Sequence, residues 1–195
     1  MPRLFFGLGL DGEVAERLCA RVRSVLHDQG PDALYRANDL HLTVAFLGEM
    51  DEASVASIQA VATEEFRGLM APELRVGGEV DAFPSREAPR AVFAGVEETF
   101  ESSGRLAAIR NRAQQVGLSH GWRPRTAENA RGFRPHVTLA RLGGRPPTGD
   151  GIYELSHERN WLPVDITLFE SLDDRFEGGD RYRIRASWPL VIRPG

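Results

Sequence analysis

Two segments of the chain share one pattern, His-x-Thr followed by apolar residues, and this pattern constrains the fold more than any other feature. The segments are LHLTVAFLG at 40–48 and PHVTLARLG at 135–143. Side chains at positions i and i+2 of a β-strand point to the same face of its sheet. The pattern therefore predicts two strands, each with His and Thr on one face and apolar residues on the other.

Each His-x-Thr strand ends a similar series of elements, in which a strand and a helix come first. Hydrophobic periodicity predicts the whole series of elements. The strands are expected at 3–10, 40–47, 73–83, 91–96, 136–142, 163–172 and 182–191, and the helices at 13–26, 51–67 and 101–116, with Asp51 as a helix cap. The repeat of strand, helix and His-x-Thr strand predicts two similar α+β lobes that face each other.

Composition bounds the class of protein. With 195 residues, 42% of them hydrophobic, and a formal charge of −4, the chain reads as one globular domain over 1–195 with two intertwined lobes. No apolar run approaches the roughly 20 residues of a membrane span. The single cysteine, Cys19, excludes an internal disulfide. We therefore expect a cytoplasmic protein that acts without a membrane and as a monomer.

The four polar residues of the two strands suit acid–base chemistry on phosphate. They are His41 and Thr43 in HLTV (41–44), and His136 and Thr138 in HVTL (136–139). Burying such groups without partners costs on the order of 1–3 kcal/mol each, so we expect the polar faces to oppose each other across a cleft. One neutral imidazole can take a proton from a nucleophile while one imidazolium gives a proton to a leaving oxygen. Threonine hydroxyls can donate to the non-bridging phosphate oxygens.

Other sites fit the sequence less well. A zinc site would need three or four ligands, and the remaining histidines, His27, His120 and His157, lie in ordinary helix or loop contexts. The segment GLGLDG at 7–12 matches a dinucleotide-binding fingerprint, with Asp32 about 20 residues further on. Asp32 lies in a Gly-Pro break, however, and not at the end of a second parallel strand. We expect no metal and no cofactor.

The doubled HxTx pattern resembles the 2H phosphoesterase superfamily. Further segments resemble the bacterial and archaeal RNA 2′,3′-cyclic phosphodiesterases, once named 2′-5′ RNA ligases. These segments are RLFFGLGL, NDLHLTVAFLGEMDE, DAFPS, APRAVFAGV, FRPHVTLAR, ITLFESL and RYR. The resemblance covers nearly the whole chain, and residues 119–130 depart from it because they are longer and richer in arginine.

The resemblance implies a fold and a reaction. The implied fold is α+β and bilobal, with two antiparallel β-sheets and outer helices around a pseudo-twofold central cleft. The implied reaction is metal-independent hydrolysis of a 2′,3′-cyclic phosphate at an RNA end to a 2′-phosphomonoester, with reverse 2′-5′ ligation as a side activity. His41 would be the proton donor and His136 the proton acceptor, and Thr43 and Thr138 would hold phosphate oxygens. The alternative is a non-catalytic module that binds RNA ends or nucleotides in the same cleft.

The second motif lies in a local excess of arginine, at 123, 125, 131, 134, 141 and 145. This excess indicates either contacts to a phosphate backbone or a solvated loop over 119–134. Arg134 stands two residues before His136, so on an extended chain it shares the face of His136 and is a candidate phosphate ligand. Phe83 and Trp122 are candidates for stacking on a base, with core packing as the alternative. The expected partners are RNA 3′ ends or nucleotides with a 2′,3′-cyclic phosphate.

Overall fold

The computed structural model describes residues 1–123, 132–143, 146–148, 151–153, 159–172 and 181–192. In chain order its elements are β1 (Arg3–Gly9), α1 (Gly12–Val25), η1 (Pro31–Ala33), η2 (Ala37–Asp39), β2 (His41–Glu49), α2 (Glu52–Glu65), β3 (Leu74–Phe83), β4 (Ala91–Glu98), η3 (Phe100–Ser102), α3 (Arg105–Ser119), β5 (His136–Arg141), β6 (Arg159–Trp161), β7 (Asp165–Ser171) and β8 (Tyr182–Pro189). The predicted strands and helices are all present. The short strand β6 and the three 3₁₀ turns were not predicted, since three residues are too few to show a period.

The strands form one antiparallel series in the order β6-β3-β4-β5-β2-β1-β7-β8. The two His-x-Thr strands, β2 and β5, are the central neighbours, and they are joined through the pairing of Leu42 with Val137. Four strands lie on each side of this contact, with β1 and β2 of the first repeat in one half and β4 and β5 of the second repeat in the other. The predicted fold class, α+β with antiparallel sheets and outer helices, is confirmed. One part of the prediction is wrong: the described strands form a single eight-stranded sheet in which the two motif strands are neighbours, whereas two sheets around a cleft were expected.

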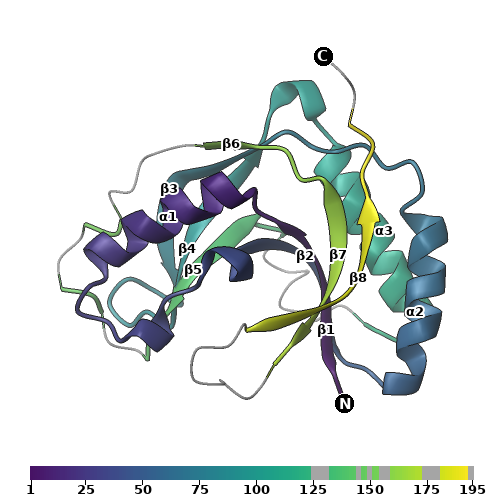
Figure 1. The fold of residues 1–195 in the computed structure, drawn as a ribbon, viewed down its shortest axis with the longest axis horizontal. Coiled ribbons are helices and arrows are strands. Elements are labelled where there is room, and N and C mark those ends of the chain that lie inside the picture. The colour runs from purple at the N-terminus through teal and green to yellow at the C-terminus, as the bar shows by residue number, and fades with distance from the viewer. Residues whose placement is uncertain (124–131, 144–145, 149–150, 154–158, 173–180, 193–195) are drawn as a thin grey trace.

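The helices are distributed over the two halves. Figure 1 shows α1 on one side of the molecule beside β3, β4 and β5, and α2 and α3 together on the other side beside β8. A guanidinium N–H of Arg110 in α3 donates to the Val44 carbonyl in β2 at 2.8 Å. The Gln59 amide in α2 donates to the Arg185 carbonyl in β8 at 2.9 Å. These contacts fix α2 and α3 against the half of the sheet that contains β2 and β8.

Both motif strands carry the same irregularity. The pairing of β1 with β2 skips Val44, and the pairing of β4 with β5 skips Leu139. An extra residue of this kind is a β-bulge, which bends the strand and interrupts the alternation of its side chains. Each bulge follows the threonine of its motif directly. The residues five places after the two histidines, Phe46 and Arg141, can therefore return to the face that carries the histidines.

Helix α3 begins later in the structure than predicted, at Arg105. The prediction placed this helix from residue 101, but Phe100–Ser102 is a 3₁₀ turn and Gly104 has a φ of 90°. The Glu98 carboxylate accepts from the backbone N–H groups of Arg105 and Leu106 at 2.9 and 3.1 Å. A carboxylate at this position satisfies N–H groups that the first turn of a helix leaves unpaired. At α2, Asp51 is the N-cap residue as predicted, but its side chain makes no capping hydrogen bond.

A single apolar cluster contains residues of both halves, among them Leu42 of β2 and Val137 of β5, which are both fully buried. None of the helices in the described ranges is long and apolar enough to cross a membrane. The buried faces of β2 and β5 thus form the centre of the core, and their other face is left for the polar residues of the motifs.

Candidate functional site

His41 is held in one orientation by the backbone. Its Nδ1–H donates to the Asp39 carbonyl at 2.8 Å, and its Nε2 lies 3.1 Å from the Thr43 hydroxyl. A carbonyl can only accept, so Nδ1 carries a proton in either charge state of the ring. In the neutral ring, Nε2 is therefore the acceptor and Thr43 the donor. The proton that His41 can gain or lose is the one on Nε2.

Three aromatic rings surround the His41 imidazole. Phe5 of β1 stacks on it with 4.8 Å between ring centroids, Phe169 of β7 lies at 5.2 Å, and Tyr182 of β8 meets it edge-on at 4.8 Å. His41 is only 9% exposed. Burial lowers the pKa of His41 from 6.5 to about 4, and the charges of His136 and Arg141 act in the same direction, against the hydrogen bond to Asp39. The ring is thus neutral near pH 7 while no anion lies beside it.

The lowered pKa of His41 predicts a loss of stability in acid. Between about pH 6.5 and 4 the unfolded chain protonates this histidine and the folded chain does not, so the free energy of unfolding falls as pH falls. At 1.36 kcal/mol for each unit of pKa difference, the expected loss is about 3 kcal/mol. Urea unfolding across this pH range measures the loss. The His41→Asn variant, which has no titratable ring, should lose correspondingly less, and equal pH dependence in both proteins would contradict the prediction.

His136 is held by the backbone in the same way but lies in a more open place. Its Nδ1–H donates to the Arg134 carbonyl at 2.8 Å. The carbonyl acceptor is again two residues before the histidine, so Nε2 is again the atom left to exchange a proton. The ring is exposed, and Phe93 of β4 is its aromatic neighbour at 5.2 Å. The two histidines therefore share one backbone geometry and differ in solvent access.

The strand register brings the two motifs together on one face. Because Leu42 pairs with Val137, the residues that flank them point to the opposite face of the sheet, which we name the motif face. His41 is the diagonal cross-strand neighbour of His136, and such neighbours are about 7–8 Å apart, with a somewhat shorter separation between their Cβ atoms. A phosphate group can lie between imidazoles at this separation. The proximity is also seen in the effect of the His136 charge on the pKa of His41.

Arg141 is a member of the motif face that sequence reasoning did not select. Its Nε–H donates to the Tyr35 hydroxyl at 2.9 Å, and its charge reaches His41, where it lowers the pKa of the imidazole. Phe46 is a second such member, stacked on Phe5 at 6.4 Å and half-buried. Both residues lie five places after a histidine, and strand alternation assigns such an odd offset to the other face, so the sequence pattern carried no signal for either.

The other predicted site residues have different surroundings. Arg134 lies 3.6 Å from the Asp81 carboxylate and over the Phe93 ring at 5.2 Å, next to His136. Phe83 ends β3 and is 54% exposed, whereas Trp122 is 9% exposed and belongs to the apolar core. For Trp122 the structure thus shows the core-packing alternative. Of the arginine-rich stretch, residues 124–131 and Arg145 lie outside the described residues.

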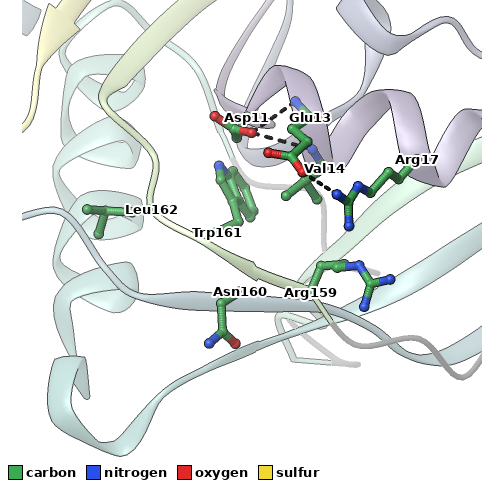
Figure 2. Close-up of a pocket in the computed structure, with 8 residues that line it drawn as sticks. All are labelled: Asp11, Glu13, Val14, Arg17, Arg159, Asn160, Trp161 and Leu162. Carbon is green, nitrogen blue, oxygen red and sulfur yellow. Dashed lines mark hydrogen bonds and ion pairs between the residues drawn. The ribbon is translucent and has the colours of Figure 1, made fainter.

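The described residues contain no group of three or more His, Cys, Asp or Glu placed to hold a metal ion. A pocket of about 350 Å³ lies between the start of α1 and β6. Figure 2 shows its lining, which includes Asp11 and Arg17 at the start of α1 and Trp161 of β6. No residue of either motif contributes to this lining. The candidate site is therefore the motif face and not this pocket.

Comparison with known proteins identifies the family of this chain. The family model described as the 2′-5′ RNA ligase superfamily matches residues 11–170. An RNA 2′,3′-cyclic phosphodiesterase of Aeropyrum pernix is 35% identical over 130 residues, which are 64% of this chain and 66% of the relative. A protein of the same name from Thermotoga maritima is 23% identical over 175 residues, 90% of this chain and 84% of the relative.

Solved structures show the same fold. The protein TT0787 of Thermus thermophilus superposes with a TM-score of 0.70 at 22% identity, covering 96% of this chain and 97% of that one. E. coli LigT in complex with 3′-AMP has a TM-score of 0.65 at 24% identity, covering 98% and 99% of the two chains. At these identities the likeness concerns the fold alone. The matched fold contains both motif strands.

Proposed function

This chain belongs to the 2′-5′ RNA ligase superfamily, and from that premise we propose that it hydrolyses 2′,3′-cyclic phosphate ends of RNA to 2′-phosphomonoesters. The observation that carries the proposal is the pair of histidines on one face, each with Nδ1 fixed by the carbonyl two residues before it. Both rings thus present Nε2 for proton transfer. The relatives named as RNA 2′,3′-cyclic phosphodiesterases support the substrate class.

In the proposed reaction, protons move through the two Nε2 atoms. His136 accepts a proton from the attacking water, whose oxygen forms the new bond to phosphorus. His41 donates a proton to O3′ as the bond between phosphorus and O3′ breaks, which leaves the phosphate on O2′. General acid–base transfers of this kind contribute about 10²–10⁴-fold each to a rate. After the turnover His41 is neutral and His136 is charged, and exchange with solvent restores both.

Positive charge and hydroxyl groups on the motif face would stabilise the phosphate. Thr43 now donates to His41, and its hydroxyl can turn to a phosphate oxygen once His41 carries a proton and no longer accepts. Thr138 occupies the corresponding place on β5. Arg141 adds a guanidinium beside His41, and arginine matches phosphate with two parallel donors. Arg134 is the cation beside His136.

The nucleoside would extend along the motif face. Phe46 is the ring of the Phe5, Phe46 and Phe169 stack that remains partly open, since Phe5 and Phe169 are 3% and 5% exposed. Aromatic faces bind bases without strong sequence preference. We therefore place base stacking at Phe46, with the exposed Phe83 as the other candidate. Both histidines come from one chain, so a monomer suffices for the reaction.

The test is hydrolysis of a 2′,3′-cyclic nucleotide or oligonucleotide in the presence of EDTA. We expect a 2′-phosphomonoester product, formed at the same rate with and without the chelator, because the residues of the motif face supply both protons and the charge. Product identity is read by chromatography against 2′- and 3′-phosphate standards. Binding without product at near-stoichiometric enzyme would instead indicate a module that binds RNA ends. Joined RNA in an assay with a 5′-hydroxyl end would reveal the reverse 2′-5′ ligation, which we expect to be minor since water competes.

A further inference from the structure

Two tyrosine hydroxyls connect the halves of the protein at the edge of the motif face. The Tyr35 and Tyr182 oxygens lie 3.1 Å apart, and Arg141 Nε–H donates to the Tyr35 oxygen at 2.9 Å. Tyr35 precedes β2, and Tyr182 belongs to β8, which lies in the same half of the sheet as β2. Arg141 ends β5, which lies in the other half. The same Tyr182 ring meets the His41 imidazole edge-on at 4.8 Å. One chain of contacts thus runs from Arg141 to His41.

The donors available fix the direction of one of these hydrogen bonds. A guanidinium cannot accept, so the Tyr35 oxygen is the acceptor from Arg141. Between Tyr35 and Tyr182 either hydroxyl can be the donor. Burial, followed by the neighbouring Tyr35, raises the pKa of Tyr182 above its ordinary value, which keeps this hydroxyl protonated. Arg141, Tyr35 and Tyr182 thus form one connected hydrogen-bonded group.

Tyr35 is buried and is held at both its backbone and its ring. Its side chain is 3% exposed, and its backbone N–H donates to the carbonyl of Leu139, the bulge residue of β5, at 3.1 Å. The Arg181 guanidinium lies over its ring at 4.6 Å, and the Arg181 backbone N–H donates to the Asp39 carboxylate at 2.9 Å. The hydroxyl that meets Arg141 is therefore a fixed point on a rigid frame. The hydrogen bond to the Tyr35 hydroxyl therefore restricts the orientation of the Arg141 guanidinium.

We propose that Tyr35 and Tyr182 are positioning residues, which hold the Arg141 guanidinium beside His41 so that it meets the substrate phosphate without reorganisation. The proposal rests on the function proposed above. Nε of Arg141 donates to Tyr35, and Tyr182 also interacts with the guanidinium. The terminal N–H groups that the two tyrosines do not bind are left for phosphate oxygens. Fixed donors stabilise developing charge better than mobile ones, because no ordering is needed during the reaction.

The test combines Tyr35→Phe and Arg141→Ala, alone and together, with a 2′,3′-cyclic nucleotide as substrate. Arg141→Ala should lower kcat/KM by about 10²–10³-fold, as the loss of a donor to the reacting group does. Tyr35→Phe keeps the buried ring and should lower kcat/KM by about tenfold, the equivalent of one hydrogen bond. In the Arg141→Ala protein, Tyr35→Phe should have little further effect, because the group that it positions is gone.

The third tyrosine of the chain is the matched control. The Arg86 guanidinium lies over the Tyr153 ring at 4.3 Å. Tyr153→Phe leaves the contacts among Arg141, Tyr35 and Tyr182 intact and should leave kcat/KM unchanged. If Tyr35→Phe fails to fold, Tyr182→Phe removes the other hydroxyl of the pair, from the less buried of the two tyrosines. Equal effects of Tyr35→Phe with and without Arg141 would overturn the positioning role, since a merely structural defect does not depend on Arg141.

The positioning role and the proposed function can fail separately. If the wild-type protein hydrolyses the substrate but the variants show no dependence on Arg141, only the positioning role is wrong. If the wild-type protein hydrolyses nothing, the function is wrong, and the affinity for adenosine 2′-monophosphate, measured by calorimetry, then decides the positioning role. Weaker binding by Tyr35→Phe, absent in the Arg141→Ala background, would support it, and unchanged binding would overturn it.

Discussion

His41→Ala and His136→Ala are each expected to lower kcat for 2′,3′-cyclic phosphate hydrolysis by about 10²–10⁴-fold. Each histidine moves a different proton in the same step, so the loss of either leaves one transfer to water. The combined variant should be little slower than the slower single variant, because groups that act as a unit are not additive. Single-turnover rates with excess enzyme measure these losses without interference from product release.

The two substitutions differ in their structural risk, and the controls follow from this difference. His136 is exposed, so its removal leaves the fold undisturbed, whereas removal of His41 opens a space between Phe5, Phe169 and Tyr182. His41→Asn reduces this risk, because its amide N–H can still donate to the Asp39 carbonyl. His27→Ala, at an exposed position after α1, is the matched control and should keep the full rate. A single-histidine variant that retains the wild-type rate would contradict the two-histidine mechanism.

The alternation of residues predicted the motif face but not its full membership. A period of two places His41 with Thr43 and His136 with Thr138, and the structure has them so. The same period assigns Phe46 and Arg141 to the opposite face, because their offset of five from each histidine is odd. The bulges at Val44 and Leu139 reverse that assignment. A bulge is a property of the pairing between strands, so no pattern within one strand reveals it.

Partners that come from distant segments were also beyond the sequence patterns. Tyr182 is 147 residues from Tyr35 in the chain, and Tyr35 lies in a segment without periodicity. Phe5 was read as part of an apolar strand, which is correct, but its stacking on His41 depends on the order of β1 and β2 in the sheet. At Gly7 of β1, an added Cβ would lie 3.3 Å from the His41 ring. The glycine that resembled part of a dinucleotide fingerprint therefore makes room for His41.

The environment of His41 leads to a second large effect, a strong dependence of substrate affinity on pH. His41 must carry a proton in order to donate it, yet burial holds its pKa at about 4. A phosphodiester anion beside Nε2 favours the imidazolium and raises this pKa in the complex. Binding must then take up a proton at neutral pH, and by linkage the affinity rises as pH falls. For one proton taken up, the change is about tenfold per pH unit between the two pKa values.

His136→Ala is the protein in which to measure this effect. It should bind a 2′,3′-cyclic nucleotide without turning it over, and the charge of this diester does not change between about pH 5 and 8. We expect Kd to rise about tenfold for each pH unit above about 5, until the pKa of the complex is passed. Calorimetry in buffers of different ionisation enthalpy should show an uptake that approaches one proton per site.

The variant that combines His41→Asn with His136→Ala separates His41 from every other titrating group. It should bind the same nucleotide with an affinity that hardly changes with pH and with no proton uptake, because no imidazole remains on the motif face. If His136→Ala alone behaves in this way, His41 stays neutral in the complex and cannot be the proton donor. The two imidazoles would then have to exchange roles, with the exposed His136 as the acid and the buried His41, neutral and fixed by Asp39, as the base.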